Sequence, residues 1–453
     1  MRLTKTFSID NNKFFIGILT DFPRYDIIPP LQDNQRQQRR NYEKIGENLF
    51  LSVCCAAIAA AGLALTACGD KENGDATAGL KPTEGLRYIP APDGEEGYWV
   101  SGMGAAEVSE VVIPSTYLDE PVTGVASSAF RENEDLISVA IPSSVKTIGE
   151  RAFYECGLLE VAFSEGLEEI GQDAFVGCKM NKIDLPESLK TIGESAFEVC
   201  DFLKKITIPA GVISIGDWSL CCSSLENITV AEDNERYYSE NNCLIEKESK
   251  TLIRAGIKSE IPEGVVVVGQ AACLGNKMER LVFPDSVTGI EKQSFSKCNN
   301  LTEVSIPSRI SVSGWGIFYK CENLKNVTIE EGITFIEEYM FSDCNSLISV
   351  NLPSTLKEIR QGAFSDCISL GSITIPDSVE EVEAHTFSQC TSLEKLVIPK
   401  SVEKLDEYAF GKEDIFLFAE VEEGEAAWEL PYNVTVYWAG EWEYRDGEPY
   451  PLE

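Results

Sequence analysis

LISVNLPSTLKEIRQGAFSDC, residues 347–367, is the stretch that determines the fold. In its first half Val350 and Leu352 alternate with polar residues, which is the period-two pattern of a half-buried strand, and a proline ends that strand. The second half contains another set of apolar residues, ending at Phe364, which would face inward from the wall opposite the strand. The segment therefore predicts one coil of a solenoid, with a strand on one wall and a phenylalanine on the other.

The same pattern recurs every 22 or 23 residues along the chain. A single coil cannot bury its apolar side alone, whereas stacked coils share one continuous core. The repeat therefore predicts a mainly β solenoid of about twelve coils with short parallel strands. The phenylalanine position is occupied by Phe130, Phe153, Phe175, Phe197, Leu220, Phe295, Phe318, Phe341, Phe364, Phe387 and Phe410.

Residues 141–156, IPSSVKTIGERAFYEC, resemble the BspA-like leucine-rich repeats of bacterial surface proteins. The resemblance extends from about Leu86 to the C-terminus. It implies a right-handed leucine-rich-repeat superhelix that acts in adhesion or protein binding and not in catalysis. No cofactor is expected.

Three regions depart from the repeat. Residues 231–261 contain two apolar stretches around a polar turn, which predicts an inserted β-hairpin that protrudes from the solenoid. The next repeat has Ala272 and Cys273 at the Ala-Phe position, so looser packing is expected there. We expect an N-terminal cap and first repeat over residues 86–130, repeats over 131–412, and an aromatic-rich C-terminal cap over 413–453.

The apolar run NLFLSVCCAAIAAAGLALTAC, residues 48–68, follows basic residues and is typical of a signal peptide. A transmembrane helix is the alternative, and the polar residues after the run disfavour it. The LTAC ending resembles the lipobox of bacterial lipoproteins, which implies lipidation of Cys68. We expect residues 1–67 to be a signal peptide with an extension from a mis-assigned start codon, and residues 68–85 to be a lipidated cysteine with a flexible tether.

The net charge of −36 excludes nucleic acid as an expected partner, because phosphate binding requires clustered basic residues. Membrane contact is expected through the lipid anchor alone, in the bacterial envelope and at the outer-membrane surface. The expected partner is a protein, either host extracellular matrix or another bacterial surface protein. In the second case the chain would be a structural or interaction component of the envelope without a host ligand. Glycan is less favoured, because no aromatic ladder follows the strands.

A cysteine follows the phenylalanine position by three residues in most coils, from Cys156 to Cys390. Stacked strands lie about 5 Å apart, which leaves disulfides open, but parallel Cβ vectors favour a buried ladder of free thiols. No C-x-x-C pair or histidine partner indicates a metal site. The only histidine, His385, is expected on the surface. Pairs such as Glu337-Glu338 are expected to form a solvated ridge, so no catalytic residue is predicted.

A ligand would meet the exposed positions on either side of each strand's central apolar residue. These two rows together hold four basic and three acidic residues, so the acidity of the chain lies elsewhere. Ordinary strand propensity explains the abundance of threonine and valine equally well. The candidate ligand-facing residues, called the front strip below, are Lys182, Asp184, Lys205, Thr207, Thr229, Arg280, Ser305, Thr328, Asn351, Thr374 and Lys395.

Overall fold

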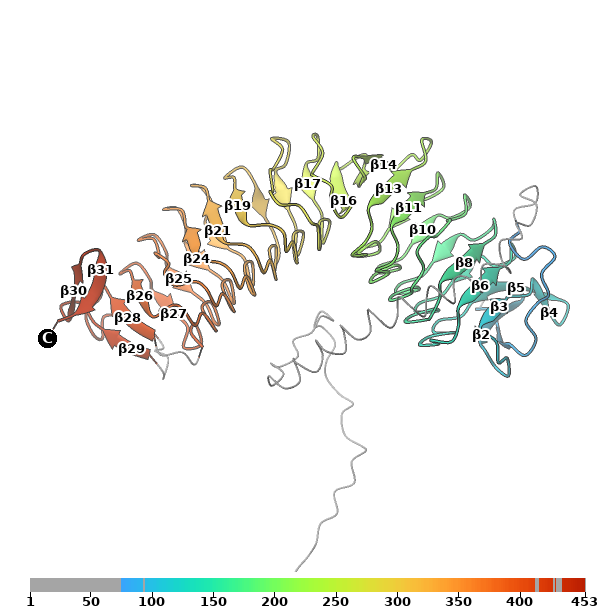
Figure 1. Cartoon of the computed structure of the whole chain (residues 1–453), viewed down its shortest axis with the longest axis horizontal. Helices are drawn as coiled ribbons and strands as arrows, with labels where there is room; N and C mark the ends of the chain where they lie inside the picture. Colours follow the sequence, from blue (N-terminus) through green and yellow to red (C-terminus); the bar gives the residue numbers. More distant parts are fainter. Residues whose placement is uncertain (1–74, 93, 412–414, 427, 429–433, 453) are drawn as a thin grey trace, which may run out of the picture. The chain divides into compact units, whose positions relative to one another are not determined.

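The computed structural model describes residues 75–92, 94–411, 415–426, 428 and 434–452. This part of the chain contains strands and turns but no helix, and it forms a β solenoid of about 15 turns (Figure 1). The prediction of a mainly β leucine-rich-repeat solenoid is confirmed, with more turns than the twelve counted from the repeat. The expected signal peptide, Cys68 and the first part of the tether lie outside the described residues.

One wall of the solenoid carries the strands that the sequence predicts, and we call them the front row. Neighbouring front strands pair in parallel, one coil apart, as Thr207 with Thr229 and Asn326 with Ser349. The front row comprises β3 (Glu110–Val112), β6 (Ser138–Ile141), β8 (Glu160–Phe163), β11 (Lys205–Ile208), β13 (Asn227–Val230), β19 (Glu303–Ile306), β21 (Asn326–Ile329), β23 (Ser349–Asn351), β26 (Lys395–Ile398), β28 (Ile415–Ala419) and β29 (Val434–Tyr437).

A second row of mostly two-residue strands, the back row, follows the proline of each coil. It is also parallel, as in the pairing of Ile148 with Ile170. The back row comprises β5 (Glu120–Val125), β7 (Thr147–Ile148), β9 (Glu169–Ile170), β10 (Thr191–Ile192), β12 (Ser214–Ile215), β16 (Thr251–Ala255), β17 (Val267–Val268), β18 (Gly289–Ile290), β20 (Ser311–Val312), β22 (Phe335–Ile336), β24 (Glu358–Ile359), β25 (Glu381–Val382) and β27 (Lys404–Leu405).

The two ends of the solenoid are built differently from its middle. At the start, β1 (Arg87–Pro90) pairs antiparallel with β2 (Tyr98–Gly102), which pairs with β5, and β4 (Thr116–Tyr117) also flanks β5. At the other end, β28 and β29 extend the front row beyond residue 412. The hairpin of β30 (Trp442–Arg445) and β31 (Glu448–Pro451) follows them. The indole N–H of Trp442 donates to the Ala419 carbonyl at 2.9 Å and holds the hairpin onto β28.

The third wall of each coil is formed by the phenylalanines. Their rings stack nearly parallel from coil to coil, with centroids 5.1 Å apart between Phe130 and Phe153 and 5.6 Å apart between Phe341 and Phe364. Each buried phenylalanine contributes about 1.5–3 kcal/mol by removal from water, and ring stacking adds to this. We call this wall the phenylalanine wall.

Two residues on the phenylalanine wall of each regular coil have positive φ, one two positions before the phenylalanine and one two positions after it. In one coil these are Arg151 and Glu155, with φ of 55° and 52°. This turn lets the N–H groups of Arg151, Phe153 and Glu155 donate to carbonyls of the next coil at 2.9, 2.8 and 2.7 Å. The wall is therefore a backbone ladder as well as an aromatic stack.

The cysteines form the buried thiol ladder that the sequence favours. All twelve described cysteines are buried and free. The Cys178 thiol donates to the carbonyl of Phe153 in the preceding coil at 3.1 Å, and the Cys344 thiol donates to Phe318 in the same way at 3.3 Å. Each such thiol therefore fills a small apolar space and also satisfies a wall carbonyl of the neighbouring coil.

The insertion forms three strands, of which the last belongs to the solenoid wall. β14 (Tyr237–Glu240) and β15 (Cys243–Glu246) form a tight hairpin whose two turn residues have positive φ. β16 pairs antiparallel with β15 and parallel with β17. The segment was expected to protrude, but Leu244 and Ile245 are fully buried.

The hydrophobic core divides into two clusters at this insertion. One cluster runs from Leu86 to Leu244, and the other runs from Cys243 to Leu417. The back row also divides there, because β12 ends one sheet and β14 begins the next. The insertion therefore separates the solenoid into two regularly stacked halves.

Val199 provides a test of the turn geometry. It is a β-branched residue at φ 57°, and its side chain is 49% exposed. The left-handed conformation costs a non-glycine residue about 1–2 kcal/mol, which exceeds the entropy cost of glycine. We expect Val199→Gly to stabilise the protein by roughly 0.5–1 kcal/mol, measured as a higher urea midpoint.

Gly177 occupies the same turn position one coil earlier, at φ 71°, and serves as the reciprocal control. Gly177→Val should lower the urea midpoint. A lower midpoint for Val199→Gly would contradict the turn geometry.

The thiol ladder predicts a reactivity pattern. Burial raises the pKa of Cys156 and Cys221 to about 11 and that of Cys243 to about 12, so their reactive thiolates are scarce at pH 8. We expect iodoacetamide at pH 8 to label none of the twelve described cysteines in the folded protein and all of them in denaturant without reductant, as read by peptide mass spectrometry. Cysteines that stay unlabelled in denaturant until reductant is added would reveal disulfides.

Candidate functional site

The front strip lies on the outer surface of the front row, as the alternation predicts. β11, β19 and β21 each alternate exposed and buried residues, with the isoleucines and valines inside. Ten of the eleven residues of the strip are exposed, and Lys395 is half-buried. Their role as ligand contacts stays a prediction.

Side chains of the front strip contact one another across coils. The hydroxyls of Thr207 and Thr229 lie 2.8 Å apart, and the Asn351 amide donates to the Thr328 hydroxyl at 3.4 Å. Lys182 and Asp184, two residues apart on one coil, form an ion pair. The strip therefore combines hydroxyl and amide groups, some of which pair across coils, with a self-neutralised charge pair near one end and three further basic side chains.

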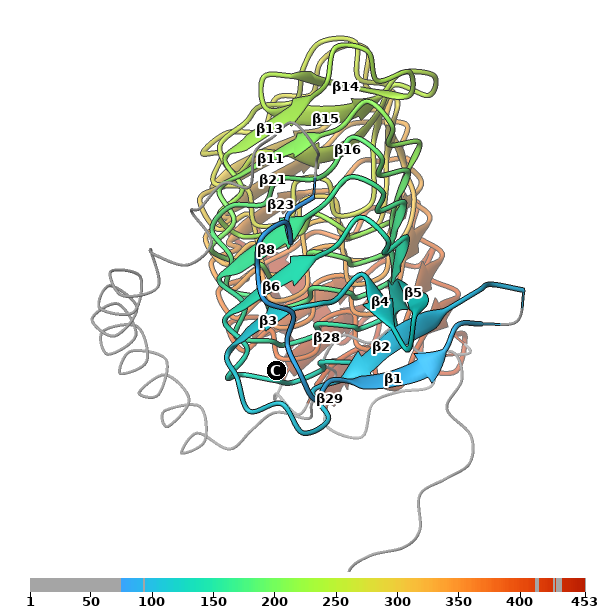
Figure 2. The same cartoon turned by 90° about the vertical axis from the view of Figure 1, so that its right-hand side faces the viewer.

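The N-terminal end of the front row is covered by residues 75–84 of the chain itself (Figure 2). The Thr83 N–H donates to the Val112 carbonyl at 2.9 Å, and the Ala76 N–H donates to the Ser164 hydroxyl at 2.8 Å. Ser138, on β6, is only 5% exposed. The sequence predicts a flexible tether up to residue 85, but from residue 75 onward this segment is attached to the front row.

Asp75 anchors this segment. Its carboxylate accepts hydrogen bonds from Ser143 and Ser164, each at 3.2 Å, and from Thr77. Partial burial alone would raise the pKa of Asp75, but the hydrogen bonds from Thr77, Ser164 and Ser143 together lower it. The segment is thus held by an ionised carboxylate near neutral pH.

Aromatic side chains cover the C-terminal end of the front row, a feature that the repeat pattern did not reveal. The Lys395 ammonium lies 4.2 Å from the centre of the Tyr450 ring, which accounts for the partial burial of this lysine. Phe416, on β28, pairs with Lys395 of β26 in the sheet. Its side chain is 41% exposed and stacks with Tyr437. The alternation of Phe416 and Phe418 with smaller apolar residues was the signal that could have identified this patch.

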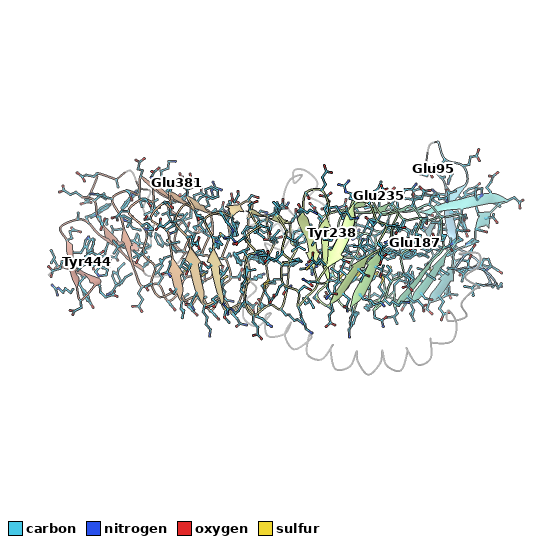
Figure 3. All side chains as sticks on the ribbon, turned by 90° about the horizontal axis from the view of Figure 1, so that it is seen from above. Glu95, Glu187, Glu235, Tyr238, Glu381 and Tyr444 are labelled. Atoms are coloured by element: carbon cyan, nitrogen blue, oxygen red, sulfur yellow. The ribbon has the colours of Figure 1, made fainter. Side chains whose placement is uncertain are left out.

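Charge on the rest of the surface is mostly acidic, as with Glu187 and Glu235 on the outside of the stack (Figure 3). One expected feature of this surface is wrong in detail. Glu337 was placed on a solvated ridge, but it is only 8% exposed, and Arg360 donates to its carboxylate at 2.8 Å. The register places Glu337 and Arg360 on neighbouring coils, but it does not show whether their side chains pair.

His385 is exposed, at the first positive-φ position of its turn, with its ring 6.1 Å from that of Tyr408. This agrees with its expected surface position. Within the described residues, no group of three or more His, Cys, Asp or Glu side chains could hold a metal ion. No helix in that same part of the chain is long and apolar enough to cross a membrane.

The geometry defines the class first: a leucine-rich-repeat solenoid with an exposed strand face. The BspA type leucine rich repeat region matches residues 123–244, 266–392 and 314–416, in six copies. These matches cover more than half of the chain, so the protein belongs to the BspA-type leucine-rich-repeat family. No curated protein matches the sequence.

The chain is similar to several solved structures, and the first of them shares its fold. A leucine-rich repeat protein from Eubacterium ventriosum is 24% identical, with a TM-score of 0.54, over 66% of this chain and 90% of that one. One from Bacteroides ovatus is 25% identical, with a TM-score of 0.42, over 78% of this chain and 99% of that one. A leucine rich cell surface protein from Faecalibacterium prausnitzii is 24% identical, with a TM-score of 0.43, over 73% of this chain and 91% of that one.

Proposed function

We propose that this chain is a lipid-anchored protein of the bacterial cell surface that binds another protein, without catalysis, through its front strip. The observation that carries the proposal is the exposed row of hydroxyl, amide and paired charged groups between the covered ends of the front row. Solenoids of this kind present extended surfaces that suit macromolecular partners. A host matrix protein is the favoured partner, and glycan is a less favoured one.

The open part of the front strip extends from Lys182 to Thr374, because chain segments cover the front row before and after it. Six of its ten residues carry short hydroxyl or amide side chains, three are basic and one is acidic. Hydroxyl and amide groups can donate and accept hydrogen bonds, which suits a partner's polar side chains and backbone. On a chain of net charge −36, the open strip has a small excess of basic residues, which favours contact with acidic proteins.

Two glutamate substitutions on the strip test the binding face. Thr229 and Ser305 are exposed front-strip residues. We expect Thr229→Glu with Ser305→Glu to weaken binding to immobilised basement-membrane extract at least about tenfold, since unpaired carboxylates would be desolvated at the interface. Surface plasmon resonance measures the effect.

The control uses Ser214 and Ser311, which are exposed on the back row. Ser214→Glu with Ser311→Glu changes the net charge equally and should leave binding within about twofold. Equal losses for both pairs would rule out the front strip as the binding face. Absence of binding to the extract by the unaltered protein would favour a structural role in the envelope.

The anchor requires a separate experiment, because Cys68 lies outside the described residues. We expect antibody labelling and protease shaving of intact source cells to detect the unaltered protein, and Cys68→Ala to abolish both signals because the unlipidated chain is not retained. Cys55→Ala, within the same apolar run, is the matched control and should leave both signals unchanged. Protection of the unaltered protein from protease would contradict surface display.

A further inference from the structure

The coil that contains the insertion lacks its phenylalanine-wall turn. In a regular coil five positions separate the back-strand residue Ile148 from Phe153, whereas three separate Leu252 from Ala255. Ala255 nevertheless makes the bond of a wall phenylalanine, because its N–H donates to the Ala272 carbonyl at 2.8 Å, as the Phe153 N–H donates to Ala174. The shortened coil thus keeps one rung of the ladder and loses the turn around it.

Polar backbone groups on both sides of this gap have lost their coil-to-coil partners. Among the described residues, no group accepts a hydrogen bond from the Leu220 N–H, which holds the place of the Phe153 N–H. The Gln270 carbonyl, which holds the place of the Gln172 carbonyl, likewise receives no hydrogen bond in this part of the chain. A donor and an acceptor therefore face the gap from opposite coils.

Arg254 replaces part of the missing turn. Its guanidinium donates to the carbonyls of Ala271 at 3.0 Å and of Cys222 and Leu274, each at 3.2 Å. The side chain is 2% exposed, and its Nε–H has no hydrogen-bond partner within the described residues. Arg254 thus joins the two halves of the solenoid and leaves one more buried donor unsatisfied.

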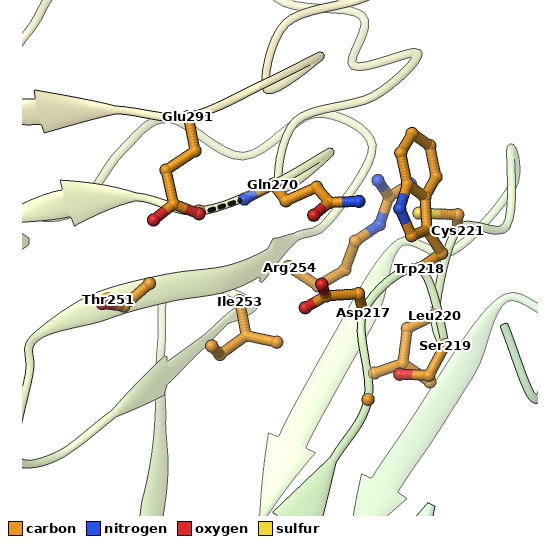
Figure 4. A pocket seen from close by; sticks show the side chains of 12 residues that line it. Asp217, Trp218, Ser219, Leu220, Cys221, Thr251, Ile253, Arg254, Gln270 and Glu291 are labelled. Carbon is orange, nitrogen blue, oxygen red and sulfur yellow. Dashed lines mark hydrogen bonds between the residues drawn. The ribbon is translucent and has the colours of Figure 1, made fainter. Parts of the chain in front are cut away.

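A pocket of about 90 Å³ opens at this gap. One water needs roughly 10–15 Å³ of such volume, so there is room for a larger group. Figure 4 shows Arg254 beside Trp218 and Gln270, and Asp217 and Glu291 also line the pocket. Asp217 and Glu291 are both exposed, and the carboxylate of Glu291 accepts the Gln270 N–H at 3.0 Å.

We propose that this pocket binds a short segment of a partner polypeptide that carries a basic side chain. A peptide carbonyl would accept from the Leu220 N–H and the Arg254 Nε–H, and a peptide N–H would donate to the Gln270 carbonyl. That alternation is what each regular coil supplies to its neighbour. The carboxylates of Asp217 and Glu291 select a lysine or arginine over an acidic residue. The site is separate from the front strip and does not depend on the proposed function.

The experiment compares two peptides that differ in one charge, acetyl-Gly-Lys-Gly-amide and acetyl-Gly-Glu-Gly-amide, by ligand-observed NMR titration against the full chain. We expect the lysine peptide to bind with a millimolar dissociation constant and about three- to fivefold more tightly than the glutamate peptide. Asp217→Asn with Glu291→Gln should reduce that preference to less than about twofold, since a glutamine at 291 can still accept the Gln270 N–H.

Glu263→Gln with Glu232→Gln is the matched control. Both glutamates are exposed and lie outside the pocket lining, and the two substitutions remove the same charge as the pocket pair. This pair should keep the preference of the unaltered chain. Stronger binding of the glutamate peptide would overturn the proposal and indicate an anion site at Arg254. Absence of binding by both peptides would overturn the proposal as well. So would a preference for the lysine peptide that persists in the Asp217→Asn and Glu291→Gln variant but falls in the control variant.

Discussion

Every coil of this solenoid must bury its interior against two neighbours, because a coil of 22 or 23 residues has no core of its own. The phenylalanine wall is where this constraint is strictest. Ring centroids 5.1–5.9 Å apart leave no room for a coil of different width. The other regular features follow from this spacing. Alanine precedes most of the phenylalanines, small cysteines follow them, and paired left-handed residues turn the backbone within one coil thickness.

The same constraint explains what the insertion costs. Where the wall turn is shortened, aromatic stacking stops at Phe197 and resumes at Phe295, and the core divides into two clusters. The buried cation of Arg254 is held by three backbone carbonyls. Carbonyl dipoles stabilise a guanidinium less than a carboxylate does. The hydrogen bonds of Arg254 therefore connect the two halves of the solenoid without restoring the full packing energy of a coil. The insertion is therefore the place where the solenoid is least regular.

The repeat predicted those parts of the molecule that depend on the period. The burial of Phe364, the free thiol of Cys344 and the exposure of Thr328 all follow from register, because a residue's wall is fixed by its place in the coil. Contacts between non-repeating segments were not predictable in this way. Asp75 reaches Ser164 across 89 positions, and no periodic signal connects two such residues.

The insertion also shows what the repeat pattern could not predict. Its apolar stretches correctly indicated strands, but the insertion forms three strands instead of the two of a hairpin, and the third, β16, joins the back row. The choice depends on whether Leu252 can pair with Val268 in the next coil, which is a long-range register. The pocket at Arg254 could not be predicted from the sequence either, because it also depends on long-range register. It lies where a shortened turn leaves hydrogen-bonding groups without partners. Local patterns identify groups that are paired, and a three-dimensional structure is needed to identify those left unpaired.

These two kinds of surface place different limits on recognition. Residues of the front strip project from a regular strand and contribute little to the core, so they can vary at small cost to stability. Arg254, which lines the pocket, joins the two halves through its hydrogen bonds, so a change at this residue affects folding as well as the pocket. A repeat protein built in this way can alter the ligand of its strand face while the chemistry of the pocket stays fixed. Because the front strip lies on the front row and the pocket lies where the phenylalanine wall is interrupted, a change on the strip need not alter the pocket.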